Sequence, residues 1–302
     1  MAAPEDIWLR DVYEQHHRAL HVHCYHLAGN VADADDLVQE TYLRAWRSRD
    51  SFEGRSSVRT WLHRIATNVF LDHRKAAAAR TAPAGDLFEW NTQLGPYPDA
   101  LLDEDPLTGR AADELVELAL IAALQHLPPR QRAAFVLRDI HGWTPTEIAR
   151  LLGAAVPAAN SLVQRARQTV RRHVPADPGH WRRPRLTAQD VRILHRYATA
   201  TDVATLRELL AEDVRLTMPP DPPVLGIDAT AEFLARPLDW RTVTSAANGR
   251  PAMVCYLRRP GMDRHEALVV DVLRIADGLI VEINAFVGAH HVAAFNLPPS
   301  LT

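Results

Sequence analysis

The chain has 302 residues, of which 47% are hydrophobic and 24% charged, and its formal net charge is -3. This length suffices for about two or three domains with cores of their own, and the composition excludes a collagen-like or wholly disordered chain. No apolar run approaches the roughly 18 residues of a membrane-spanning helix, and the N-terminus lacks the basic start and apolar core of a secretory signal. Cys24 and Cys255 form no metal-ligand spacing, so we expect a cytoplasmic protein.

The small net charge hides blocks of opposite sign. Residues 1–43 carry a net charge of -6 and residues 44–80 carry +6, whereas residues 86–117 carry -8 and residues 130–183 carry +7. Two basic segments joined by an acidic one predict two polyanion-binding surfaces on a flexible tether. The alternative is that these charges are ordinary solvated helix faces.

Residues 7–80 have a helical pattern. Gly29 and Asn30 are expected to end the first helix, and Asp33 is expected to be the N-cap of the second. The apolar stripe of the second helix is spaced by three and four residues, which predicts burial of Ala34, Leu37, Val38, Thr41 and Ala45. The opposite face carries Asp36, Gln39, Glu40 and Arg47, which a protein partner could recognise.

A third helix is predicted from about Val58. Its expected buried residues are Trp61, Leu62, Ile65, Ala66, Val69 and Phe70. Its opposite face is expected to present Thr60, His63, Arg64, Thr67, Arg74 and Lys75, with Asn68 at the border. Such a basic, hydrogen-bonding face suits phosphates and base edges.

The runs at residues 33–46 (DADDLVQETYLRAW) and 52–68 (FEGRSSVRTWLHRIATN) closely resemble region 2 of extracytoplasmic function (ECF) sigma factors of the sigma-70 superfamily. The resemblance implies that Asp36, Gln39 and Glu40 dock on the beta-prime clamp helices of core RNA polymerase. It also implies a set of contacts to the melted minus-ten strand, made by Arg55, Ser56, Arg59, Arg64 and Asn68. A basic groove with a pocket for an extruded base suits that task.

Histidines are frequent in the first helix, at positions 16, 17, 21, 23 and 26 around Cys24. His17 and His21 lie one turn apart, as metal ligands often do. No carboxylate or second thiol completes a ligand set, however, and Cys24 also fits as a small packed residue. We therefore expect no metal and no cofactor.

A second helical module begins after residue 113. Pro128 and Pro129 start one helix, which is expected to end near His141 with Gly142 as a left-handed cap. The run 144–147 (TPTE) is a capping box that opens the next helix, and Gly153 turns the chain into a helix beginning at Pro157. This pattern predicts a helix-turn-helix, whose second helix normally lies in the DNA major groove. Its expected buried stripe is Val156, Ala159, Val163, Ala166 and Val170.

The runs at 126–138 (HLPPRQRAAFVLR), 142–153 (GWTPTEIARLLG) and 160–167 (NSLVQRAR) are similar to sigma region 4. The resemblance implies that the recognition helix reads the minus-35 element through Asn160, Ser161, Gln164 and Arg165. Many relatives have Ser or Thr just before this helix, whereas this chain has Ala154 and Ala155. The missing cap predicts weak promoter affinity through this module.

After Pro184 two helices are expected, at 187–199 and 202–210, followed by strands at 214–218, 240–247, 252–258, 267–275 and 279–286. Asn248-Gly249 and Asp277-Gly278 are typical two-residue hairpin turns. The arrangement and the run 277–286 (DGLIVEINAF) are similar to the SnoaL-like, ketosteroid-isomerase-like cone that some ECF sigma factors carry.

Members of that fold include enzymes, which makes a general base conceivable in this module. The candidates are Asp213, Asp263, His265, Asp271 and Asn284, but the sequence fixes no acid and base pair. We expect a regulatory domain without catalysis. An apolar ligand pocket lined by Trp240, Tyr256, Asn284 and Phe286 is the alternative to a plain core.

The sequence thus predicts a multidomain protein with two all-α helical DNA-binding modules and a C-terminal α+β cone. Its expected divisions are region 2 (1–80), an acidic linker (81–112), region 4 (113–175), a second linker (176–186) and the cone (187–302). The expected function is that of a sigma factor regulated in cis, with core polymerase, promoter DNA, and a small ligand or an anti-sigma protein as partners. The rival interpretations are a helix-turn-helix regulator independent of polymerase, and a SnoaL-like enzyme fused to a DNA-binding module.

Overall fold

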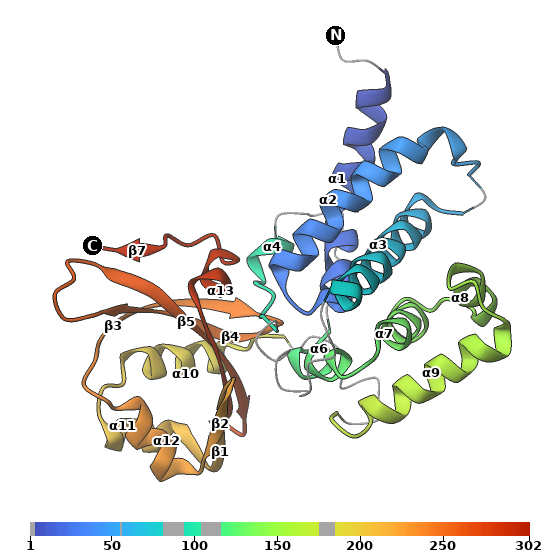
Figure 1. Cartoon of the computed structure of the whole chain (residues 1–302). Helices are drawn as coiled ribbons and strands as arrows, with labels where there is room; N and C mark the ends of the chain where they lie inside the picture. Colours follow the sequence, from blue (N-terminus) through green and yellow to red (C-terminus); the bar gives the residue numbers. More distant parts are fainter. Residues whose placement is uncertain (1–3, 55, 81–93, 104–115, 175–184) are drawn as a thin grey trace. The chain divides into compact units, whose positions relative to one another are not determined.

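The computed structural model describes residues 4–54, 56–80, 94–103, 116–174 and 185–302 (Figure 1). The chain forms two compact units. Unit 1 contains Met1–Leu94 and Glu104–Arg182, and unit 2 contains Gly95–Asp103 and Arg183–Thr302. None of the helices within the described residues is long and apolar enough to cross a membrane.

Unit 1 begins with three mutually packed helices, α1 (Pro4–Ala28), α2 (Val31–Ser48) and α3 (Val58–Arg80), with a short 3-10 turn η1 (Arg49–Ser51) after α2. Gly29 ends α1 at a φ of 89°, as predicted. The prediction for the next N-cap was wrong by three residues. Asn30 caps α2, and its side-chain oxygen accepts a hydrogen bond from the Asp33 backbone N–H at 2.8 Å.

The buried stripe predicted for α2 is confirmed, and Val31 and Tyr42 extend it. In α3 the prediction failed on one side. His63 and Thr67, expected on the polar face, are 2% and 0% exposed, and Trp61 is only half-buried. The reason is that α3 packs against α7 of the second helical module as well as against α1 and α2, which buries a second face.

The second module comprises α6 (Leu118–Gln125), α7 (Pro129–Phe135), a π-helical turn η3 (Val136–Ile140), α8 (Pro145–Leu151) and α9 (Val156–Val170). Thr144 and Glu147 form the predicted capping box, and Gly142 and Gly153 have positive φ angles of 73° and 58°. The helix-turn-helix is therefore confirmed. The predicted buried stripe of α9 was wrong at Val156, which lies in the first turn and is 38% exposed.

Unit 2 is a curved sheet that wraps around α10 (Figure 1). Its strand order is β2-β1-β6-β5-β4-β3, with β1 and β6 parallel, the other neighbours antiparallel, and β7 paired with β5. The strands are β1 (Leu210–Met218), β2 (Asp221–Leu225), β3 (Asp239–Ala247), β4 (Arg250–Arg258), β5 (His265–Ala276), β6 (Leu279–Val287) and β7 (Ser300–Leu301). The helices are α4 (Ala100–Asp103), α10 (Ala188–Thr199), α11 (Val203–Leu209), α12 (Ile227–Leu234) and α13 (Ala289–Ala293).

The α+β cone is confirmed, including both hairpin turns. Asn248 and Gly249 have φ angles of 51° and 73°, and Asp277 and Gly278 have 52° and 79°, as a type I′ turn requires. The elements β2, α12, α13 and β7 were not predicted. They are short, and β2 contains two prolines at its exposed edge, which conceals the alternation of a strand.

A buried arginine joins the two helical modules of unit 1. The Arg132 guanidinium is 2% exposed and donates to the carbonyl oxygen of Leu27 at 2.6 Å, at the C-terminal end of α1. It also donates to the side chain of Gln125 at 2.5 Å and to the backbone oxygens of Gln125 and Leu127 at 3.2 and 3.3 Å. Arg132 thus satisfies a helix-end carbonyl of the first module from within the second.

We expect Arg132→Met to destabilise unit 1 by roughly 2–4 kcal/mol, because it removes charge-assisted hydrogen bonds and leaves the Leu27 carbonyl buried without this donor. Amide hydrogen exchange at the end of α1, with the melting temperature, measures the effect. Arg130→Met is the matched control, since the exposed Arg130 donates only within the second module, to Leu152. Equal behaviour of the two variants would contradict the linking role of Arg132.

Candidate nucleic-acid interface

An acidic face of α2 turns away from the core of the first module. Asp36 and Gln39 are exposed, and they follow the buried Ala34, Leu37 and Val38 around the helix. Glu40 is partly covered and accepts a hydrogen bond from Arg44 at 2.8 Å. Arg44 also donates to Asp72 of α3 at 2.7 Å, which holds Glu40 in a fixed position. The three predicted residues therefore share one face, with Asp36 and Gln39 the more accessible.

The basic face predicted for α3 is narrower than expected. Asn68 is exposed and Arg64, one turn before it, is half-buried, as are Ser56 and Arg59. Arg55 lies outside the described residues. His63 and Thr67 do not belong to this face, because they point into unit 1. A hydrogen bond from the Thr60 backbone to the Ser57 hydroxyl, 3.1 Å long, holds the first turn of α3 beside these residues.

The recognition helix α9 presents all four of its predicted contact residues to solvent. Asn160, Ser161, Gln164 and Arg165 are exposed and lie opposite the buried Ala159, Val163, Ala166 and Val170. Farther along the helix, a shallow surface groove is lined by Gln164, Arg165, Arg167, Gln168, Arg171 and Arg172. Its four arginines make it strongly basic, which suits a phosphate backbone.

The start of α9 is uncapped by any side chain. Ala155 occupies the N-cap position in the extended conformation that a capping residue adopts, with φ -74° and ψ 150°, but it has no oxygen to accept a hydrogen bond. Pro157 lies in the first turn. The absence of a capping hydroxyl costs α9 about 0.5–2 kcal/mol relative to Ser or Thr. This confirms the local feature from which weak promoter affinity was predicted.

The residues proposed for a ligand pocket in the cone do not lie together. In the β3–β4 pairing, Trp240 lies opposite Leu257 and Arg241 lies opposite Tyr256. Because paired residues share a face and successive residues alternate, Trp240 and Tyr256 occupy opposite faces of the sheet. Phe286 lies on the face of Tyr256, where its ring meets that of His291 from α13. Asn284 accepts a hydrogen bond from Thr217 at 2.7 Å. These four side chains are therefore distributed over two faces.

A buried acid on the α10 side of the sheet was among the catalytic candidates. Asp271 is 6% exposed and accepts hydrogen bonds from the Tyr197 hydroxyl at 3.2 Å and from the Cys255 thiol at 3.9 Å. Burial raises the pKa of Asp271 to about 7. Of the other candidates, His265 pairs with Asp239 at 2.9 Å, on the edge strand β3. The structure therefore gives Asp271 a carboxyl that titrates near neutrality inside a packed apolar core.

A segment expected in the acidic linker is bound to unit 2 instead. The backbone N–H of Tyr97 donates to the Asn248 side chain at 2.8 Å, and the Asn248 N–H donates back to Tyr97 at 2.9 Å. Asp99 receives a hydrogen bond from Gly249 at 3.0 Å and donates its own N–H to Ala246 at 2.9 Å. Tyr97 is 1% exposed. The β3–β4 turn thus holds the segment through both backbone and side-chain contacts.

Sequence reasoning missed the burial of Arg132, His23 and His63 and the partial burial of His141. The helical period gave no signal for His63, which it placed on the polar face, although a polar residue inside a fold needs a partner there. The contacts that join distant parts of the chain span 44 to 118 residues, so no local pattern contains them.

Three family models match the chain. Residues 12–80 match Sigma-70 region 2, residues 117–170 match Sigma-70, region 4, and residues 191–283 match the SnoaL-like domain. Each match falls on one of the three groups of elements described above. The order of the modules predicted from the sequence is therefore confirmed.

Relatives extend over most of the chain. It is 38% identical over 312 residues to the ECF RNA polymerase sigma factor SigG of Mycobacterium tuberculosis, covering 95% of this chain and 83% of that protein. It is 35% identical over 162 residues to SigM of the same species, covering 53% and 74%. The crystal structure of the M. tuberculosis extracytoplasmic function sigma factor SigJ shares the fold, with a TM-score of 0.60 at 24% identity over 95% of this chain and 99% of that one.

The raised pKa of Asp271 makes the stability of unit 2 depend on pH. The folded state binds this proton more tightly than the unfolded chain, whose carboxyl has a pKa of 3.8, so the contribution is full below about pH 4 and is lost as the pH rises through about 7. Asp271→Asn should therefore be more stable than wild type above pH 7, by up to about 4 kcal/mol, and equal to it near pH 4. Calorimetry across this range tests it, with the exposed Asp263→Asn as control. A constant difference at every pH would refute the assignment.

Proposed function

The chain belongs to the ECF RNA polymerase sigma factors, and on that premise we propose which of its residues carry the steps of initiation. As a sigma factor it binds core RNA polymerase and directs it to promoter DNA. The single observation that carries the residue assignments is the match between the charge of each module's exposed face and the partner expected for that module. Each sigma module exposes, opposite its buried stripe, a face whose charge suits its expected partner.

Core polymerase docks on the acidic face of α2. Asp36 and Gln39 supply the direct contacts, since both side chains are exposed. Glu40 contributes from a fixed position because Arg44 and Asp72 hold it in a chain of ion pairs. A negative face of this kind is complementary to a basic surface on the beta-prime clamp helices.

Reversing one charge on this face tests the docking. Asp36→Arg should weaken binding to core polymerase at least tenfold without changing the melting temperature, because the side chain is exposed and like charges at an interface repel. Asp50→Arg, at the exposed end of the same region, makes the same change of charge and should bind normally. Titration of fluorescent core polymerase measures both. Undiminished affinity of Asp36→Arg would exclude this face.

The two DNA-reading tasks fall to different helices. On α3, Arg64 and Asn68 lie one turn apart and are proposed to contact the melted minus-ten strand, together with Arg59 of the first turn and Ser56 just before the helix. Arg55, which lies outside the described residues, is proposed to act with them. On α9, Asn160, Ser161, Gln164 and Arg165 are proposed to read the minus-35 element in the major groove. The basic groove beyond Arg165 fits the adjoining phosphates.

This division predicts opposite defects in two variants. Asn68→Ala should impair strand opening more than duplex binding, because a base pocket matters only after melting. Arg165→Ala should weaken duplex binding by about 1–3 kcal/mol and leave opening of the bound promoter unaffected. Permanganate footprinting reports opening and gel-shift titration reports binding. Equal effects of both variants in both assays would contradict the assignment.

The cone is proposed to regulate the sigma modules in cis rather than to catalyse a reaction. The supporting observation is that residues 95–103 dock on the β3–β4 turn. In sequence, these residues lie between the two sigma modules. About fourteen residues remain on either side of the docked segment, a reach of at most about 50 Å each. The cone therefore shortens the tether of both modules and limits their independent motion.

Loosening this contact should release the restraint. Asp99→Ala removes the acceptor for Gly249, whereas Asp99→Asn keeps a side-chain oxygen in the same place. We expect Asp99→Ala to raise non-specific DNA affinity and to make residues 81–112 more sensitive to protease, with Asp99→Asn close to wild type. Fluorescence anisotropy and limited proteolysis measure the two effects. A failure of Asp99→Ala to differ from Asp99→Asn would remove the support for regulation through this segment.

A further inference from the structure

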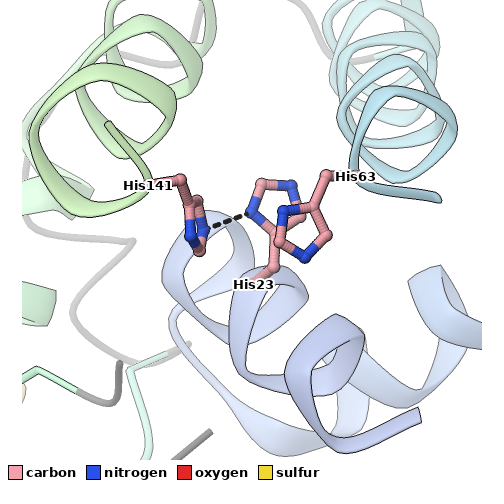
Figure 2. A group of neighbouring side chains, drawn as sticks. All are labelled: His23, His63 and His141. Atoms are coloured by element: carbon pink, nitrogen blue, oxygen red, sulfur yellow. Dashed lines mark hydrogen bonds between the residues drawn. The ribbon is translucent and has the colours of Figure 1, made fainter. Parts of the chain in front are cut away.

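Three histidines from distant parts of the sequence meet inside unit 1. Figure 2 shows His23 of α1, His63 of α3 and His141 after η3 turned toward one another. One nitrogen from each ring lies within 4.8 Å of the others. The rings of His23 and His63 stack at 4.3 Å, and the ring of His141 lies 4.9 Å from that of His23 and 4.6 Å from that of His63. Two of the three belong to region 2 and one belongs to region 4.

The hydrogen bonds around Thr67 define the state of the His23 ring. The Thr67 hydroxyl donates its only proton to the His63 carbonyl oxygen at 2.8 Å. The 3.0 Å contact between His23 Nε2 and the same hydroxyl then requires Nε2 to be the donor. His23 Nδ1 is left with its lone pair, and it faces His141 Nε2 at 2.9 Å. Metal-ligating histidines are oriented in this way, by a hydrogen bond from the second ring nitrogen.

The cluster also has buried nitrogens that the fold leaves unused. His63 Nε2 and both ring nitrogens of the neighbouring His26 are buried and have no hydrogen-bond partner in the structure. Unsatisfied polar atoms of this kind are rare in proteins and call for an explanation. Burial lowers the pKa of His23 to about 3 and holds those of His63 and His141 well below the ordinary value, so the three rings carry lone pairs rather than positive charge. Neutral imidazole is the form that binds metals.

We propose that His23, His63 and His141 form a site for a divalent cation of the Zn²⁺ type. Three imidazole nitrogens without a carboxylate suit Zn²⁺, and they do not suit Ca²⁺ or Mg²⁺, which need oxygen ligands. Zn–N bonds of about 2.0–2.1 Å place neighbouring ligand nitrogens roughly 3.4 Å apart. Ring movements of about 1 Å from the present separations reach that spacing.

The site has a consequence for regulation, which rests on the proposed function. The minus-ten and minus-35 elements are about 25 base pairs apart, on the order of 85 Å along the duplex. The two sigma modules must therefore separate to read both, whereas His23 and His141 are 2.9 Å apart. A cation held by ligands from both modules binds only the form in which the two modules pack together, which we call the closed form. It therefore shifts the population away from the form that reads promoters.

Metal binding to the full-length, chelator-treated protein tests the site directly. We expect one Zn²⁺ per chain, measured by competition with a chromophoric chelator, and the visible bands of tetrahedral cobalt when Co²⁺ replaces it. His141→Gln, at the half-buried edge of the cluster, should abolish both. Thr67→Val, which removes the hydroxyl that accepts from His23 Nε2 and donates to the His63 carbonyl oxygen, should weaken affinity about 10- to 100-fold.

The control is another histidine pair in the same unit. The rings of His126 and His173 stack at 4.2 Å, and neither residue belongs to the three-histidine cluster. His126→Gln should bind Zn²⁺ as wild type does. Melting curves recorded without metal show whether each variant folds. Wild-type binding no tighter than that of His141→Gln would overturn the site.

Runoff transcription with core polymerase tests the regulatory consequence separately. Zn²⁺ should lower the yield with the wild-type protein and leave His141→Gln unaffected, which excludes inhibition of the polymerase itself. Binding without this difference would overturn the regulatory role and retain the site. Loss of promoter-specific transcripts from both proteins without Zn²⁺ would instead contradict the proposed function.

Discussion

The charge of Arg132 is buried against neutral oxygens, and the closed arrangement of unit 1 depends on where those oxygens lie. Its guanidinium donates to one side-chain amide and three backbone carbonyls, one of them at the end of α1. Burial lowers the pKa of Arg132 to about 9. A guanidinium is tolerated there because several aligned carbonyl dipoles replace its hydration. The second module therefore packs on the first in one defined position, with α7 against α3 and α6 against α1.

That packing explains the main difference between the sequence-based prediction and the structure. The apolar period of α3 located the buried Leu62, Ala66, Val69 and Phe70, whereas Trp61 and Ile65 are only half-buried. It contained no information on the second face, which α7 covers. His63 and Thr67 look like solvent-facing polar residues in sequence, and they are buried because their partners come from α1 and from the end of η3. Patterns of three and four residues describe a helix against one neighbour. They do not describe a helix packed between two.

Several features set by local chemistry were predictable to the residue, although the N-cap of α2 was not. The hairpin turns at 248–249 and 277–278 and the capping box at 144–147 depend on atoms within four residues of one another. The exposed faces of α2 and α9 followed from helical period alone, except at the first turn of α9, where Val156 is 38% exposed. The docking of residues 95–103 was less accessible to sequence, because 151 residues separate Tyr97 from Asn248. The docked segment is rich in turn-forming residues. Because such residues occur both in linkers and in docked segments, composition does not distinguish the two.

The composition of the interface between the sigma modules also suits an arrangement that has to open. An interface of large apolar side chains would lose the favourable energy of burial when it separates, at about 25 cal/mol for each square ångström exposed. Here an arginine, three imidazoles and a threonine hydroxyl lie at the contact between the modules, beside the apolar packing of Leu71 on the core of the second module, and water hydrates each of the polar groups on opening. Their burial fixes the relative position of the two modules more than it stabilises their contact, since desolvation offsets most of the hydrogen-bond energy. A closed form of small net stability responds to any ligand that prefers one state, because moving such an equilibrium from 1:99 to 99:1 takes only about 5.5 kcal/mol of differential binding. In the proposed mechanism, core polymerase and promoter DNA favour the open form, and the docked tether of the cone acts on the same equilibrium through the chain length that it leaves free.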